Sequence, residues 1–158
     1  RTGRILCILY LIHKGLLDMP ILYLSSYMLQ NKDNYSYSLS NVTGSGNWRG
    51  WLSFMLEAVI ETSDFTIYKI EQIRTLMANT EKQIGAYKQS LLKIEISKLF
   101  EQPYIRPKSL LSDKIKSINT AKKYLSELES LGLLAKERIG KEYVWFNTEL
   151  MEILSSEC

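Results

Sequence analysis

The clearest fold pattern in this chain lies in residues 108–146, which read KSLLSDKIKSINTAKKYLSELESLGLLAKERIGKEYVWF. Residues 108–115 predict a short helix, and residues 117–119 predict a turn that carries capping side chains. A longer helix is predicted over residues 120–131, because its apolar side chains recur every three or four positions. Gly132 is expected to end this helix, since many helices stop at a glycine in the left-handed conformation.

Two strand-like runs follow the second predicted helix. Residues 133–138 and 142–146 lie on either side of a turn at residues 139–141, and residues 149–154 predict a short closing helix. Helix, turn, helix and β-hairpin is the element order of a winged helix-turn-helix. We therefore expect a small α+β winged-helix domain in this part of the chain.

The preceding residues predict mainly α structure, because Gly85 is the only glycine within residues 51–131. Residues 5–14 are apolar on all faces, so we expect a buried helix there. A side-chain cap from Ser25 or Ser26 is expected to start the next helix. The fold class predicted for the whole chain is a mainly α helical bundle followed by the winged-helix domain.

Residues 44–47, which read GSGN, indicate a loop, and a helix is predicted over residues 48–61. A stripe with gaps of three and four residues then follows, with Thr80 at its one polar position. Its apolar members are Ile70, Ile73, Met77, Ile84, Tyr87, Leu91 and Ile94. Two interpretations fit this spacing: a coiled-coil seam that joins two copies in a homodimer, or one long helix packed on its own domain.

Composition excludes several classes of protein. The 158 residues are 46% hydrophobic and 23% charged, which excludes a disordered or collagen-like chain. Cys7 and Cys158 are the two cysteines, and no CxxC or Cys/His cluster is present, so neither a disulfide scaffold nor a metal site is expected. The longest apolar run, residues 5–12, is too short to cross a bilayer. We expect a cytoplasmic chain with no membrane partner.

The net charge of +3 hides two regions of opposite sign. Residues 102–126 hold six Lys or Arg residues against one acidic residue, whereas residues 127–158 hold three against seven. Pro103 and Pro107 mark a change in sequence composition in the same region. We accordingly divide the chain into a helical domain over residues 1–90 and a winged-helix domain over residues 91–158.

The basic segment contains the candidate DNA-binding residues, because lysines on the second helix and at the wing can neutralise phosphates. They are Lys108, Asn119, Thr120, Lys122, Lys123 and Lys141. The alternative interpretation is that these are solvated faces of a domain used for protein contacts or dimerisation.

The chain opens with Arg1-Thr2-Gly3-Arg4, which resembles the last four positions of the Fic family signature, H-P-F-x-[DE]-G-N-G-R-x-G-R. The resemblance continues through further segments and into the predicted second helix of the winged domain. These segments are residues 15–20, 23–25, 31–35, 48–59 and 99–104, with Thr120-Ala121 and Tyr124-Leu125 in that helix. The chain thus resembles the part of a Fic protein that follows the signature, with a C-terminal winged helix.

This resemblance implies that the intact, bacterial protein transfers AMP from ATP to a hydroxyl side chain of a target protein, with Mg²⁺ as a second cofactor. Arg1, Gly3 and Arg4 would contact the phosphates, and Tyr35 is a candidate on the adenine side. In Fic proteins the signature histidine is the base and the signature carboxylate holds Mg²⁺.

His13 does not correspond to that base, because it follows Arg4 instead of preceding it. We expect no catalytic residue and no metal ligand in this chain, no tightly bound cofactor, and no AMP transfer by the chain alone. The alternative function is a winged-helix regulatory module that binds DNA or protein.

Overall fold

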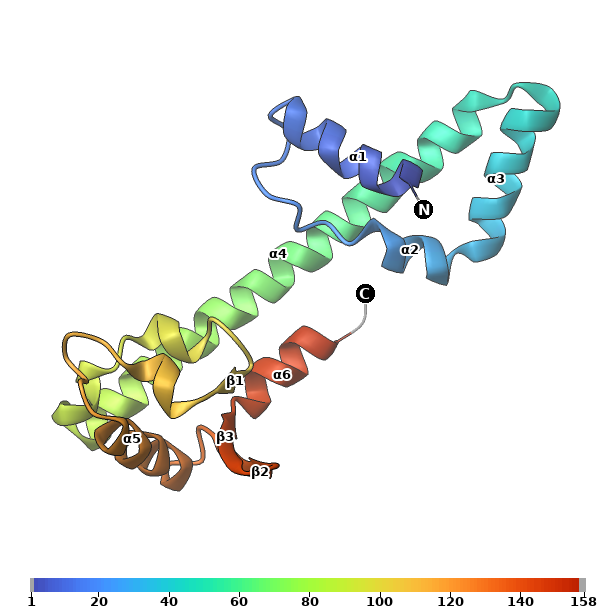
Figure 1. Cartoon of the computed structure of the whole chain (residues 1–158). Coiled ribbons are helices and arrows are strands. Elements are labelled where there is room, and N and C mark those ends of the chain that lie inside the picture. The colour runs from blue at the N-terminus through green and yellow to red at the C-terminus, as the bar shows by residue number, and fades with distance from the viewer. Residues whose placement is uncertain (1, 157–158) are drawn as a thin grey trace. The chain divides into compact units, whose positions relative to one another are not determined.

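A computed structural model describes residues 2–156 of the chain, apart from the side chains of Thr2 and Arg4 (Figure 1). The prediction of a mainly α fold with a small α+β part is confirmed. The chain forms two compact units, the first reaching Lys69 and the second covering Ile70–Ser156. This division places residues 70–90 in the second unit, whereas the domain predicted from the sequence over residues 1–90 includes them.

The first unit contains α1 (Thr2–His13), α2 (Leu24–Gln30), α3 (Lys32–Ser45) and the first part of α4 (Trp48–Tyr87). Its core consists of four buried side chains: Leu24, Met28, Phe54 and Ala58. Tyr27, Tyr35 and Trp51 surround Phe54, with ring centroids 5.5 to 6.4 Å from their neighbours.

The expected burial of the first helix is wrong for the described residues. Ile5, Leu6, Leu9 and Tyr10 are each more than half exposed, and only Cys7 and Ile8 pack against the core of the first unit. An apolar helix is buried on all sides only when other elements cover all of its faces. Here α1 lies against other residues of its unit on one side.

Two local predictions in this unit also need correction. The helix α2 begins at Leu24, with Tyr23 at the N-cap position, so Ser25 and Ser26 lie inside the helix and do not cap it. The predicted loop at residues 44–47 is shorter than expected, because α3 continues to Ser45 and Gly46 closes it in the left-handed conformation.

The helix α4 runs without a break for 40 residues and crosses from the first unit into the second (Figure 1). It ends at Tyr87, so the apolar stripe predicted over residues 70–94 does not form one helical seam. Leu91 and Ile94 follow in and after a 3-10 turn and are buried in the core of the second unit. The interpretation as a long helix packed on its own domain fits residues 70–87, where Ile84 joins that core.

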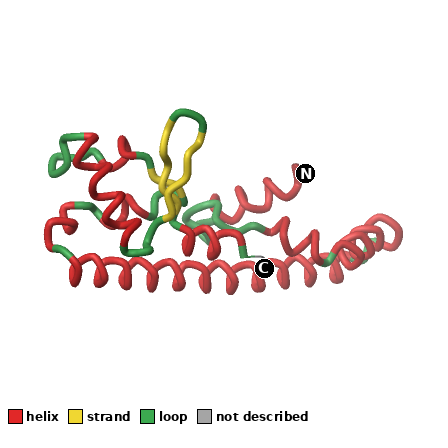
Figure 2. The backbone as a smooth tube through the Cα atoms, turned by 90° about the horizontal axis from the view of Figure 1, so that it is seen from below, coloured by secondary structure: helices red, strands yellow, loops and turns green. Residues whose placement is uncertain are grey.

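The second unit continues with short turns, a helix and a three-stranded sheet. In chain order these are η1 (Gln89–Lys93), η2 (Ile96–Leu99), β1 (Tyr104–Ile105), η3 (Pro107–Leu110), α5 (Ile118–Ser130), β2 (Ala135–Ile139), β3 (Glu142–Phe146) and α6 (Thr148–Ser155). The strands are antiparallel in the order β1-β3-β2, with Trp145 of β3 opposite both Ile105 and Lys136. We call the hairpin of β2 and β3 the wing; Figure 2 shows it extending from the helices of its unit.

The prediction of a first helix over residues 108–115 in the helix-turn-helix is wrong. Only residues 107–110 are helical, as a 3-10 turn that begins at Pro107. Ser112 and Ile115 then exchange two backbone hydrogen bonds of 3.0 Å, which close a tight turn and leave no room for a continuing helix. The second helix, the wing and the closing helix are confirmed, with boundaries shifted by two residues or fewer.

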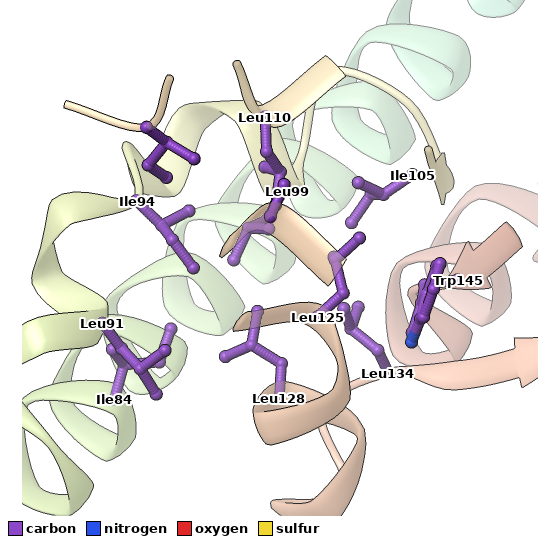
Figure 3. Close-up of a cluster of buried hydrophobic side chains, with 12 residues drawn as sticks. Ile84, Leu91, Ile94, Leu99, Ile105, Leu110, Leu125, Leu128, Leu134 and Trp145 are labelled. Carbon is purple, nitrogen blue, oxygen red and sulfur yellow. The ribbon is translucent and has the colours of Figure 1, made fainter. Parts of the chain in front are cut away.

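Twelve buried side chains form the core of the second unit (Figure 3). They come from the end of α4, the 3-10 turns, α5, the sheet and the segments between them, and Leu125 and Leu128 of α5 are fully buried among them. Gly132 ends the helical turn after α5 with a φ of 77°, as predicted. Asn147 caps α6 by accepting a hydrogen bond from the Leu150 backbone N–H, and its amide donates to the Leu99 carbonyl.

Candidate nucleic-acid interface

A groove of about 480 Å³ opens on the second unit between η3, the start of α5 and the wing. Four cationic side chains line it, and Glu142 is the one carboxylate in its lining. The lining residues are Arg106, Pro107, Lys108, Ile118, Lys122, Lys141, Glu142 and Tyr143. We call this feature the basic groove. Three of the lysines predicted to bind DNA, Lys108, Lys122 and Lys141, therefore meet in one place.

Arg106 and Lys108 reach the groove from either side of Pro107. Their backbone is held because Ile105 pairs with Trp145 in the sheet and Leu110 is buried in the core. The backbone N–H of Ser109 also donates to the Arg106 carbonyl at 2.9 Å, which closes the 3-10 turn. The backbone that carries these two cationic side chains is thus held by a sheet pairing, a buried leucine and a local turn.

Lys122 reaches the groove from α5. Ala121 and Leu125 on the same helix are fully buried, so the helix can be docked in only one rotation. That rotation exposes Lys122 and places Ile118, one turn earlier, in the same groove.

Lys141 and Tyr143 reach the groove from the wing. Gly140 makes the turn between the strands with a φ of 63°, a conformation that L side chains rarely adopt. The Arg138 side chain donates to the Gly140 carbonyl at 3.3 Å. Lys136 lies with its ammonium 4.5 Å from the centre of the Tyr143 ring, which restricts that ring from the neighbouring strand.

The cations of the basic groove are available to an external anion. Within the described residues, none of the four cationic side chains is paired with a carboxylate; the ion pair in this unit joins Lys88 and Glu127. Four cations beside the single carboxylate of Glu142 leave the groove with an excess of positive charge, which attracts polyanions. The arrangement is therefore suited to contacts with several phosphates.

The other candidate residues lie outside the lining of the groove. Asn119 and Lys123 are exposed and Thr120 is half-buried on α5. Lys123 follows Lys122 directly, and consecutive helical residues point about 100° apart. Arg106, Ile118 and Tyr143 were not among the residues predicted from the sequence. Arg106 lies within the basic segment that the charge count had already identified.

An ion pair fixes the opposite end of α5. The Lys88 ammonium lies 2.9 Å from a carboxylate oxygen of Glu127, just after the end of α4. The hydrogen bond to Glu127 raises the pKa of Lys88 above its ordinary value. This ion pair joins α5 to the residue that follows α4.

Comparison with known families identifies the second unit. Residues 70–150 match the family described as protein adenylyltransferase SoFic-like, C-terminal domain, which covers just over half of the chain. The chain belongs to this family. The match begins at Ile70, where the second unit begins, so the SoFic-like C-terminal domain includes the end of α4. The resemblance to Fic proteins in the sequence analysis is confirmed.

The nucleotide-site candidates of this SoFic-like chain lie in the first unit. Arg1 and the side chain of Arg4 lie outside the described residues, and Gly3 is an exposed residue of α1. Tyr35 is half-buried, with its ring centroid 5.5 Å from that of Trp51 and 6.0 Å from that of Phe54. Adenine contact by Tyr35 stays a prediction.

The described part of the SoFic-like chain has no membrane-spanning helix and no cluster of metal-ligating side chains. No helix within residues 2–156 is long and apolar enough to cross a membrane. The same part of the chain contains no group of three or more His, Cys, Asp or Glu side chains that could hold a metal ion.

Proposed function

We propose that the second unit binds duplex DNA through the basic groove. The observation that supports this proposal is the convergence of Arg106, Lys108, Lys122 and Lys141 from three separate segments. Cations at these points can contact phosphates on both sides of a groove in the duplex, while the start of α5 faces the bases. Such contacts release counterions, so the affinity depends strongly on salt.

The test measures the dissociation constant of the chain for a labelled duplex at several salt concentrations. If all four cations contact phosphates, the slope of log K against log[salt] is about −3 to −4. Lys122→Gln is expected to reduce the magnitude of that slope by about 0.9, since one phosphate contact is lost.

Lys123→Gln is the matched control. It removes the same charge from the next residue of α5, but Lys123 is not part of the groove lining. We expect its salt slope to equal that of the unsubstituted chain. Equal losses for both variants, or no binding to duplex DNA at low salt, would contradict the proposal.

We further propose that this binding unit serves a protein that transfers AMP from ATP to a hydroxyl side chain of a target protein, with Mg²⁺. Membership of the adenylyltransferase family supports this activity for the protein to which such a C-terminal domain belongs. The 158 residues by themselves are proposed to be inactive. Their single histidine, His13, is an exposed residue at the end of α1 and follows Arg4 in the chain.

Incubation of the chain with ATP labelled at the α-phosphate and Mg²⁺, in a cell extract as the source of targets, tests the inactivity. We expect no transfer of label to protein above that of an extract without the chain. Label transferred by this chain, and lost on removal of Mg²⁺, would show that the 158 residues contain a complete active site.

A further inference from the structure

Two apolar side chains lie among the cations of the basic groove. Ile118 is 47% exposed and Tyr143 is 49% exposed, and both line the groove beside Lys122 and Lys141. Phosphate neutralisation requires neither residue. Covering a half-exposed apolar side chain with a ligand stabilises the complex. The position of Ile118 and Tyr143 therefore indicates that the bound surface has an apolar feature at this point.

The two side chains are held in place by different parts of the unit. Ile118 is the first residue of α5, and the burial of Ala121 and Leu125 fixes the rotation of that helix. Tyr143 is restricted by the Lys136 ammonium over its ring. Both surfaces are therefore ordered before a ligand arrives, which lowers the entropy lost on binding.

We infer that Ile118 and Tyr143 form a contact for the C5 methyl group of a pyrimidine in the major groove of duplex DNA. This inference rests on the proposed DNA binding. The start of a recognition helix is the part that approaches base edges, and the thymine methyl is the apolar feature that the major groove offers there. Thymine and 5-methylcytosine carry the same methyl group at the same edge.

The experiment compares four duplexes of one length by fluorescence anisotropy with the complete chain. The first contains thymine and cytosine, the second replaces every thymine with uracil, and the third and fourth repeat both with 5-methylcytosine in place of cytosine. Loss of one buried methyl contact weakens binding about fourfold, so we expect the uracil duplex to bind about fourfold more weakly.

The arms distinguish the two sources of the methyl group. A loss with uracil and no gain with 5-methylcytosine assigns the contact to thymine, whereas a gain with 5-methylcytosine alone assigns it to methylated cytosine. Either result supports the inference. Salt-dependent binding that is equal for all four duplexes overturns it and leaves the proposed DNA binding intact. No binding to any duplex overturns the proposed function itself.

Variants locate the contact on the protein. Ile118→Ala is expected to bring the affinities for the thymine and uracil duplexes closer together, because Tyr143 remains, whereas Lys122→Gln weakens both and keeps their ratio. Ile67→Ala is the matched control, because Ile67 is also exposed but lies in the first unit. A thymine-to-uracil ratio that survives in Ile118→Ala would remove Ile118 from the contact. The comparison of duplexes with the unsubstituted chain needs no variant to fold.

Discussion

The two units place similar apolar sequences in different environments. In the second unit, twelve buried side chains from the end of α4, the 3-10 turns, α5, the sheet and the segments between them form one core. In the first unit the core consists of four buried apolar side chains, while apolar residues of α1 and α4 such as Leu6, Leu56 and Ile60 stay more than half exposed. The difference follows from how many elements cover each helix, and the apolar content of the helices does not explain it.

The largest expected effect comes from the second core. Leu125→Ala removes a fully buried side chain of α5 and should lower the free energy of unfolding of the second unit by about 2–5 kcal/mol. Urea unfolding followed by Trp145 fluorescence measures this loss. Trp48→Phe and Trp51→Phe in the background remove the two tryptophans of the first unit, so the signal reports on the second.

Leu56→Ala is the matched change in the first unit. Leu56 is 65% exposed on α4, so the same substitution should change the free energy of unfolding by less than about 0.5 kcal/mol. A loss as large as that of Leu125→Ala would show that the two units do not differ in the way described.

A smaller effect is expected at Asn147, which is buried and caps α6. Asn147→Ala removes the cap of the Leu150 N–H and the donor to the Leu99 carbonyl, and should cost about 1–3 kcal/mol. Asn147→Ser retains an oxygen for the cap and loses the amide donor, so its urea midpoint should fall between those of Asn147→Ala and the unsubstituted chain. Identical midpoints for all three would contradict this role.

The ion pair of Lys88 and Glu127 should contribute less than Asn147, because the lysine is exposed to solvent. The hydrogen bond to Glu127 raises the pKa of Lys88 in the folded chain. The contribution of the ion pair to the free energy of unfolding is therefore complete below the pKa of Lys88 in the unfolded chain, and it disappears as the pH rises through the pKa of Lys88 in the folded chain. The difference in urea midpoint between Lys88→Gln and the unsubstituted chain should stay constant near neutrality and shrink only above about pH 10. A difference that shrinks near neutral pH would contradict this assignment.

The smallest effect on stability at neutral pH is expected from the ionisation of Tyr27 in the first unit. Burial, followed by the carboxylates of Glu57 and Glu61, raises the pKa of the Tyr27 phenol above its ordinary value. The folded unit keeps this proton longer than the unfolded chain, so the first unit should lose stability only above about pH 10. Absorbance titration of the unsubstituted chain against Tyr27→Phe measures it, and a tyrosine that titrates below the others would contradict the direction.

Local patterns predicted the second half of the second unit well. The helix over residues 120–131, the wing and the closing helix each depend on contacts between near neighbours in sequence, and all three are present. The failures arose where one local turn and the packing of the core overrode the pattern. The Ser112–Ile115 turn stopped a helix that the composition allowed, and the end of α4 at Tyr87 moved Leu91 and Ile94 from a stripe into a core.

The candidate site shows the same limit. The charge count identified the basic segment, and Lys108, Lys122 and Lys141 were selected by their expected places on a helix and a wing. The rotation of α5 decides that Lys122, and not its neighbour Lys123, lines the groove. That rotation is set by the buried Ala121 and Leu125 packing against distant residues.

By itself, the sequence determined that the chain is mainly α, that a helix and a β-hairpin follow its basic segment, and that the chain resembles the Fic family. These properties follow from periodicity, glycine positions and short motifs, which act over a few residues. Tertiary structure alone brought Arg106, Ile118 and Tyr143 into one groove, and left one apolar face of α1 exposed. The pairing of β1 with β3 and the packing of α5 join residues far apart in sequence, and no local pattern encodes those distances.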